Sequence, residues 1–278
     1  MDKYSALTLE LFSDFLNRHD CLISKEDVKR ITDLGFSKEY AYALLISTMY
    51  NIDVSANKEW FNEYLLPSIK CLDENRYLQN PYYKNISLDN VTNKKWKIKM
   101  DSYKPMQAFV FNDFFLQDNK VLFNIGFFEK EFKFPAIYEN DRLWMSITPN
   151  EIETMQEAIN KAFGHILVLG LGIGYFPYMI SLKENVKSIT IIEKSKDAIE
   201  LFESNIYPQF SNKVVNIIEM DAFEYLDNID EKMNFVFADL WHDVSDGKEL
   251  YLKIKEYEKK YRKIEFSYWI EKTIKFYL

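Results

Sequence analysis

Three closely spaced glycines in the C-terminal half of the chain are typical of a ligand-binding loop. Gly170, Gly172 and Gly174 follow an apolar segment within HILVLGLGIGYFPYMI, and the spacing predicts a strand, a turn and then a helix that contains Pro177. Glycine allows a sharp turn and a close backbone approach to a ligand, while a helix N-terminus offers unpaired N–H groups to a carboxylate. The G-x-G-x-G spacing differs from the G-x-G-x-x-G of dinucleotide-binding folds and favours a nucleoside without phosphates.

Acidic residues follow or close the next three predicted strands. Glu193 ends SITIIE about 20 residues after the glycines, where an acidic side chain typically binds a ribose diol. Asp221 follows NIIEM, where it could accept a hydrogen bond from an adenine amino group, and Asp239 follows FVFA beside the expected reacting centre. Taken one at a time, the glycines could simply form tight turns and the acids could cap helices or lie on the surface. The order in which glycines and acids follow successive strands favours one ligand site at the carboxyl ends of the strands.

The elements that must position these residues alternate between helix and strand from Thr148 onward. This alternation predicts a parallel sheet covered by helices on both faces. Thr148, Pro149 and Glu151 form a capping-box-like start for a helix that runs to about Phe163. The predicted strands are residues 165–169, 188–193, 214–219, 234–239 and 263–268.

The N-terminal half has a different pattern. Apolar residues recur at helical spacing over residues 4–72, with Ser24 and Ser37 as predicted N-caps. Over residues 91–144 the period approaches two, which predicts a small antiparallel sheet with a hairpin turn at Asp118 and Asn119. The polar segment 75–90, which contains Pro81, is the predicted linker. We therefore expect a helical region (1–90), an antiparallel β region (91–147) and a ligand-binding domain (148–278).

Composition narrows the class of protein. The net charge of −8 argues against non-specific binding to nucleic acid by the chain as a whole, although this net charge does not exclude a local basic patch. Cys21 and Cys71 are far apart, which indicates reduced thiols rather than a disulfide framework or a zinc site. The acidic N-terminus does not resemble a signal peptide, and glycines and a proline break the apolar run 166–182. We expect a cytoplasmic protein without a membrane span.

From about Tyr138 to Tyr257 the chain resembles class I S-adenosylmethionine-dependent methyltransferases, most of all their spermidine-synthase-like branch. The segment ITPNEIETMQEAI is similar to LTERDEFIYHEMI of the polyamine synthases, and MDAFEYL at residues 220–226 is similar to their GDGFEFL. The resemblance implies that ribose, adenine and the transferred group lie beside Glu193, Asp221 and Asp239 respectively, with a gating loop at 240–247.

Departures from that branch argue against aminopropyl transfer. Polyamine synthases carry GGGDGG, whose aspartate recognises the donor amine, whereas this loop has Ile173 at that place. The family's substrate-contacting tyrosine and histidine are replaced by Met155 and Gln156. The polyamine synthases have a proline directly after the acidic or amide residue at the end of the fourth strand, whereas here Leu240 follows Asp239. The D/N-P-P-Y motif of many N-methyltransferases does not occur after this strand, and Val168 replaces the acidic residue that often opens the glycine motif.

Other side chains could take part in chemistry. His242 is the one histidine in the expected catalytic loop and could accept a proton, although an exposed loop position is the commoner role. His165 and His19 are expected to be structural. The aromatic residues that could surround a sulfonium through cation–π contacts, or simply pack, are Trp241, Tyr175 and Tyr178.

The predicted fold is α/β, a Rossmann-like methyltransferase fold with a shortened, mostly parallel sheet of order 3-2-1-4-5. The residues after position 268 are too few for two further strands and their helix. We expect the N-terminal elements or another subunit to cover the edge of the fifth strand, since an exposed edge invites aggregation. The β-rich segment 91–144 is expected beside the mouth of the active site.

The predicted activity is S-adenosylmethionine-dependent methyl transfer to an unidentified small molecule. Aminopropyl transfer from a decarboxylated donor and a non-catalytic nucleoside-binding or assembly module are the alternatives. A homo-oligomer is compatible with the sequence, and no metal is expected. The predicted catalytic residues are Asp239 and His242, and the predicted cofactor-binding residues are Gly170, Leu171, Gly172, Gly174, Tyr175, Glu193, Lys194, Asp221, Ala222 and Asp239.

Overall fold

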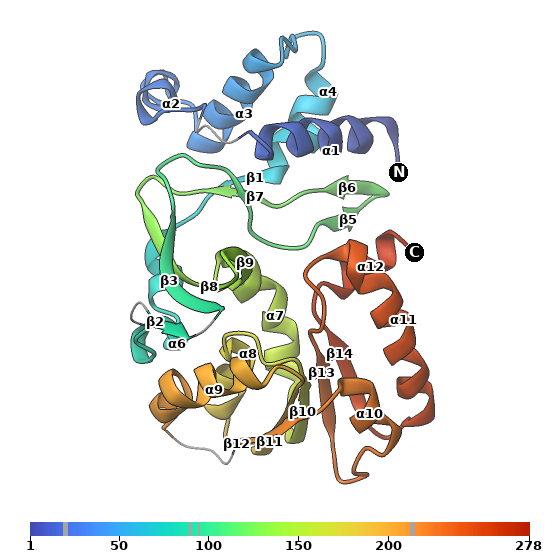
Figure 1. Ribbon diagram of the computed structural model, residues 1–278. Coiled ribbons are helices and arrows are strands. Elements are labelled where there is room, and N and C mark those ends of the chain that lie inside the picture. The colour runs from blue at the N-terminus through green and yellow to red at the C-terminus, as the bar shows by residue number, and fades with distance from the viewer. Residues whose placement is uncertain (19–21, 89–90, 94, 212–214) are drawn as a thin grey trace. The chain divides into compact units, whose positions relative to one another are not determined.

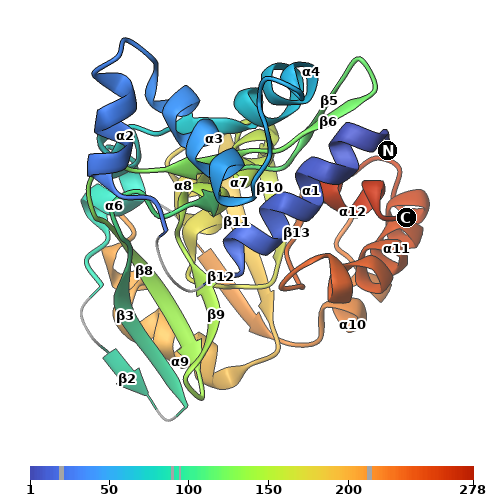
Figure 2. The same ribbon diagram turned by 90° about the horizontal axis from the view of Figure 1, so that it is seen from above.

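The computed structural model describes residues 1–18, 22–88, 91–93, 95–211 and 215–278 (Figures 1 and 2). The predictions for His19 and Cys21 fall outside these residues. The chain groups into two compact units, each built from two separate stretches. Unit 1 comprises Met1–Tyr77 and Ser102–Lys133, and unit 2 comprises Leu78–Asp101 and Phe134–Leu278. The three successive regions expected from the sequence stay a prediction.

Helices form most of the first stretch of unit 1, as the apolar spacing predicted. Ser24 and Ser37 cap α2 and α3 through their side chains, which confirms both predicted N-caps. The side chains of Tyr42 and Phe127 stack with ring centroids 4.2 Å apart in the core of this unit. The helices are α1 (Lys3–Leu16), α2 (Lys25–Thr32), α3 (Lys38–Met49), α4 (Lys58–Trp60), a π-helical turn (Phe61–Leu65), a 3₁₀ turn (Leu66–Ser68) and α5 (Glu74–Leu78).

Short strands complete unit 1. Three strands form a sheet of order β1-β7-β4, and β5 pairs with β6 in a hairpin. Asp118 and Asn119 connect β5 to β6 with φ of 51° and 65°, so the predicted hairpin turn is confirmed and has the left-handed backbone of a two-residue turn. The strands are β1 (Ile69–Cys71), β4 (Phe109–Val110), β5 (Phe115–Gln117), β6 (Lys120–Leu122) and β7 (Ile125–Phe127).

A second sheet, of order β2-β3-β8-β9, belongs mainly to unit 2 (Figure 2). Its strands are β2 (Val91–Asn93), β3 (Trp96–Tyr103), β8 (Phe132–Glu139) and β9 (Arg142–Ser146). The pairs β2–β3 and β8–β9 are antiparallel. The strands predicted over residues 91–144 therefore form, but they are divided between this sheet and the sheets of unit 1 rather than making one small sheet.

An all-parallel sheet of five strands forms the centre of unit 2 and has the order β12-β11-β10-β13-β14. The alternation of helix and strand thus gives a mixed α/β fold that is compatible with a Rossmann-like fold. The strands are β10 (Gly164–Leu169), β11 (Val186–Glu193), β12 (Val215–Glu219), β13 (Phe235–Ala238) and β14 (Glu265–Tyr268). They differ from the predicted ranges by one or two residues at their ends, and Val214 lies outside the described residues.

Helices cover both faces of this sheet. In Figure 1, α8 and α9 lie on one side of the strands, and α10 and α11 lie on the other. Central strands between two helical layers are apolar along their length, and accordingly residues 166–169 of β10 are all buried. Phe176 of α8 stacks on Phe237 of β13, with ring centroids 3.8 Å apart. The helices of unit 2 are α6 (Pro81–Asn85), α7 (Pro149–Lys161), α8 (Tyr175–Ser181), α9 (Lys196–Asn205), α10 (Ala222–Asp227), α11 (Val244–Lys260) and α12 (Glu271–Phe276).

The chain after β14 forms α12 and adds no strand to the five within the described residues. The described residues after β14 thus contain no sixth or seventh strand, and the all-parallel sheet has five. What covers the free edge of β14 stays a prediction. No helix in the described ranges is both long and apolar enough to cross a membrane.

Candidate functional site

A cavity of about 390 Å³, here called the main cavity, opens beyond the carboxyl ends of β10, β11, β12 and β13. Its volume lies in the range of sites for small ligands and cofactors. The predicted site residues that line it are Gly170, Leu171, Gly172, Glu193, Lys194, Asp221, Ala222, Asp239 and His242. These residues come from four separate strand–helix junctions, and the parallel sheet brings them together.

The first glycine is required by the protein's own backbone. Gly170 has φ of 94°, and a Cβ there would lie 2.1 Å from the backbone oxygen of Asp239. The N–H of Asp239 donates to the carbonyl of Leu169 at 3.0 Å, and the N–H of Gly170 donates to that of Ile192 at 3.0 Å. A side chain at position 170 would therefore push β13 away from β10.

Met145 of β9 covers the middle of the glycine loop, a contact that the sequence did not predict. Its Sδ atom accepts a hydrogen bond from the N–H of Ile173 at 3.3 Å. A Cβ on Gly172, whose φ is 53°, would lie 2.2 Å from the same sulfur. Close approach to a ligand is therefore not the sole reason for glycine at this position.

The carboxylates of Glu193 and Asp221 are partly engaged by backbone N–H groups. Glu193 accepts from Ser195 at 2.8 Å through Oε1 and from Leu171 at 3.2 Å through Oε2. Asp221 caps α10 by accepting from the N–H groups of residues 223 and 224 through Oδ1 alone. A carboxylate oxygen has more than one acceptor site, so both side chains retain capacity for ligand hydroxyl or amino groups.

Two predicted cofactor-binding residues, Gly174 and Tyr175, line neither the main cavity nor the second cavity described below. Tyr175 is 1% exposed, and its hydroxyl accepts a hydrogen bond from Asn80 at 2.9 Å. Tyr178 is held in the same way by Asn85 at 2.9 Å. The segment predicted as a linker therefore contains a helix, α6, and the side-chain amides at its two ends donate hydrogen bonds to α8.

Glu151 lines the main cavity, although the sequence suggested a capping role for it. Thr148 is the N-cap residue of α7, but its side chain makes no capping hydrogen bond, so the predicted capping box is wrong. The helical period places position 151 on the same face as Ile152 and Met155, which are buried. Glu151 Oε2 is consequently buried and has no hydrogen-bond partner. An acidic residue on the apolar stripe of this helix was the available sequence signal.

Glu151 and Asp239 interact electrostatically within the cavity. Burial raises the pKa of Asp239 to about 7. Burial, and secondarily the charge of Asp239, raises the pKa of Glu151 well above its ordinary value. Two carboxyl groups that both resist ionisation titrate as a pair, and this pair holds its protons to higher pH than exposed carboxyl groups do.

His242 stands at the rim of the main cavity, held by Asp246. Its Nδ1 lies 2.9 Å from Asp246 Oδ2, and its ring packs edge-on against Trp144 with centroids 4.5 Å apart. Burial tends to raise the pKa of Asp246, but hydrogen bonds from His242 and Asp243 outweigh it and lower that pKa. Asp246 is thus placed to accept a hydrogen bond from Nδ1–H, and in that tautomer of the imidazole Nε2 is free to act as an acceptor.

The segment implied as a gating loop, residues 240–247, is shorter than the resemblance suggested. Helix α11 begins at Val244, and Asp243 and Asp246 form a reciprocal capping box at its start. Four residues therefore remain outside helical structure. Trp241 in this short connection lines the cavity, is 5% exposed, and has an Nε1 atom without a hydrogen-bond partner.

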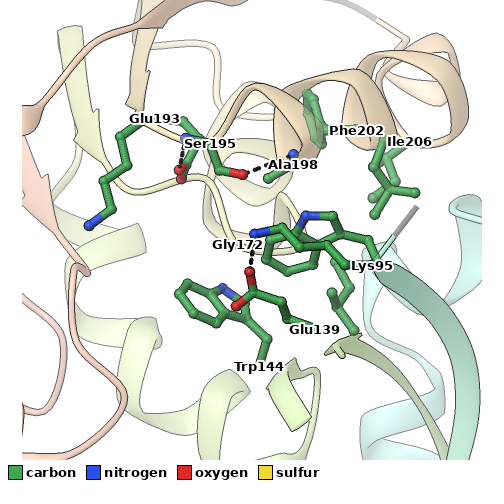
Figure 3. Close-up of a pocket in the computed structure, with 13 residues that line it drawn as sticks. Lys95, Glu139, Trp144, Gly172, Glu193, Ser195, Ala198, Phe202 and Ile206 are labelled. Atoms are coloured by element: carbon green, nitrogen blue, oxygen red, sulfur yellow. Dashed lines mark hydrogen bonds and ion pairs between the residues drawn. The ribbon is translucent and has the colours of Figure 1, made fainter. Parts of the chain in front are cut away.

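A second cavity, here called the side cavity, has a volume of about 250 Å³ and shares Trp144, Gly172, Glu193 and Lys194 with the main cavity. Figure 3 shows Ser195 and Ala198 at the start of α9 across from Lys95, Glu139 and Trp144. Lys95 forms an ion pair with Glu139. The β-rich segment therefore supplies Trp144 to both cavities and further residues to the side cavity; its place beside the mouth of an active site stays a prediction.

Comparison with known proteins adds no constraint on function. No model of a known protein family matches the chain, and no curated protein matches it. Within the described residues, no group of three or more acidic, histidine or cysteine side chains could hold a metal ion. The residues around the main cavity are therefore the basis for a functional proposal.

Proposed function

We propose that unit 2 binds S-adenosylmethionine in the main cavity and transfers its methyl group to a small molecule. The observation that carries this proposal is the convergence of Gly170, Glu193, Asp221 and Asp239 around one cavity at the strand ends. The order β12-β11-β10-β13-β14 supports assignment of these strands as 3-2-1-4-5 of a shortened Rossmann-like methyltransferase sheet.

Each strand end has a distinct task in this proposal. Glu193 accepts hydrogen bonds from ribose hydroxyls, and Asp221 accepts one from the adenine amino group, since both retain free acceptor sites. The residue set also fits the charge of the ligand, because the cavity is lined mainly by acidic rather than basic side chains. The sulfonium methyl of S-adenosylmethionine supplies the electrophile when it is bound.

Asp239 is the proposed proton acceptor for the nucleophile. An ionised Asp239 would accept the proton that the nucleophile loses when it takes the methyl group, while the electrons of the broken carbon–sulfur bond would remain on the donor's sulfur. With its pKa raised to about 7, Asp239 is close to the value that serves proton transfer at neutral pH. His242 Nε2, at the rim of the cavity, is a second group that could accept this proton. Orientation and exclusion of water provide the remainder of the catalysis.

A binding module without transfer is the second candidate, because the chain itself occupies several ligand-binding groups. The N–H of Ile173 is bonded to Met145, and both Glu193 and Asp221 have structural hydrogen bonds. Aminopropyl transfer has less support, since Ile173 is fully buried and offers no polar group to a donor amine.

Titration calorimetry with S-adenosylmethionine tests the binding step. We expect Glu193→Ala to weaken binding at least tenfold, because a ligand hydroxyl loses its acceptor. Glu184→Ala is the matched control, since this exposed residue precedes the opposite end of β11. No affinity up to millimolar ligand would overturn the proposal.

Incubation with methyl-labelled donor and a metabolite extract then separates the candidates. Labelled product that is lost in Asp239→Ala supports methyl transfer. Donor binding without any S-adenosylhomocysteine production favours the binding module, and tighter binding of the decarboxylated donor favours aminopropyl transfer.

A further inference from the structure

Most of the ionisable side chains that line the main cavity are acidic. Lys194 is the one lysine among the described residues that line it, and its side chain is exposed, while His242 is the one other titratable base. No lysine or arginine in the described part of the chain forms an ion pair with Glu151 or Asp239. The acidic lining residues are Glu151, Glu193, Asp221, Asp239 and Asp246.

Two of these acids, Glu151 and Asp239, have a pKa that is raised by burial. Glu151 reaches the cavity from α7 and Asp239 from the end of β13, and the two are close enough to influence each other's ionisation. Glu151 Oε2 is buried without a hydrogen-bond partner, so the folded chain leaves an acceptor unsatisfied at this place. Such an atom is costly unless a ligand or a proton satisfies it.

We infer that Glu151 and Asp239 together form a cation site, through which the main cavity binds a positively charged donor in preference to the neutral product of transfer. This inference rests on the proposed function. A sulfonium carries a positive charge, and the thioether left after transfer carries none. Trp144, Trp241 and Trp269 also line the cavity, and the face of an indole ring attracts a cation more than a neutral group.

The charge balance of the site changes with each ligand. Without a cation the pair holds a proton more tightly than exposed carboxyl groups do, because burial opposes two negative charges. A bound sulfonium stabilises the doubly ionised pair, so the proton passes to solvent. When the methyl group has left, the positive charge is lost and the pair takes up a proton again, which weakens the hold on the product. Glu151 is in this respect a specificity-determining residue that acts together with Asp239.

Three probes separate charge from shape. S-adenosylmethionine carries a sulfonium, sinefungin carries an ammonium group in its place, and S-adenosylhomocysteine is neutral there. We expect the two cations to bind at least tenfold more tightly than the thioether at pH 7, which corresponds to about 1.4 kcal/mol. Calorimetry in two buffers of different ionisation enthalpy should further show proton release, of up to one per site, for the cations alone.

Glu151→Gln tests the residue directly, because it keeps the shape and removes the titrating group. We expect this variant to lose most of the preference for cations and to release fewer protons on binding them, because only Asp239 of the pair still titrates. Glu157→Gln is the control, since this exposed residue lies on the same helix and does not line either cavity. A thermal unfolding scan verifies that both variants fold.

The outcomes are distinguishable. Binding of all three probes with equal affinity, or tightest binding of the thioether, overturns this inference and leaves the proposed function standing. Unchanged preference and proton release in Glu151→Gln also overturn it. Failure of every probe to bind overturns the proposed function itself and this inference with it.

Discussion

Replacement of Asp239 by asparagine should make the protein more stable at alkaline pH. A carboxyl whose pKa is raised on folding holds its proton more tightly in the native state than in the unfolded chain. The stabilisation from that proton is complete below pH 3.8, the ordinary value, and is lost as the pH rises toward the folded value of about 7. The free energy of unfolding of the wild-type protein therefore decreases across this interval because of Asp239.

The size of the effect follows from the same numbers. A rise in pKa from 3.8 to about 7 corresponds to about 4 kcal/mol at 1.36 kcal/mol per pH unit. Asp239→Asn removes this loss, since the amide does not ionise, and it also removes the charge that contributes to the raised pKa of Glu151. The variant should match the wild-type protein at pH 4 and exceed its stability by up to about 4 kcal/mol at pH 8.

Urea unfolding at pH 4, 6 and 8, followed by circular dichroism, measures the difference between the two proteins. Glu157→Gln provides a control of opposite sign, because hydrogen bonds and charges from Lys161 and Lys272 lower the pKa of Glu157. That control should be slightly less stable than the wild-type protein at pH 8. A variant at position 239 that is equally or less stable than the wild-type protein at pH 8 would refute the reasoning about the buried pair.

Three further predictions concern other parts of the chain. Gly170→Ala should lower the free energy of unfolding of unit 2 by about 1–3 kcal/mol or more, because the φ of 94° and a Cβ only 2.1 Å from a backbone oxygen both oppose a side chain. A change below about 0.5 kcal/mol in urea unfolding would show that the loop rearranges to accept the side chain. Asn80→Ala should cost about 1 kcal/mol by removing the hydrogen bond to the buried hydroxyl of Tyr175, and should leave Tyr175→Phe with no additional effect in a double-mutant cycle. Burial raises the pKa of the Cys71 thiol to about 11. In a variant that lacks the other cysteine, alkylation of Cys71 at pH 8 should therefore be about 100-fold slower than alkylation of a thiol with a pKa of 9. Equal alkylation rates in the folded and the urea-unfolded protein would contradict this.

Local sequence patterns determined the order of elements in unit 2. The apolar runs of β10, β11 and β13 and the residues that follow them are close in sequence, so Glu193 and Asp239 could be assigned to strand ends before any contact was known. Their meeting at one cavity follows from parallel strand direction, because parallel strands place all their carboxyl ends at one edge of the sheet. The same reasoning identified the N-caps at Ser24 and Ser37 and the Asp118–Asn119 turn, each of which depends on a few neighbouring residues.

The tertiary structure alone decided which distant side chains complete the site. Met145 reaches the glycine loop from β9, and Glu151 reaches Asp239 from α7, although neither pair is related by a short spacing in the sequence. The same is true of the β-rich segment, whose strands pair in different units even though their alternating pattern is uniform. A period of two or of 3.6 reports which face of an element is apolar, but it does not report which other element covers that face. Glu151 was therefore assigned by its local pattern to a helix cap, and only the packing of α7 against the sheet placed its carboxyl in the cavity beside Asp239.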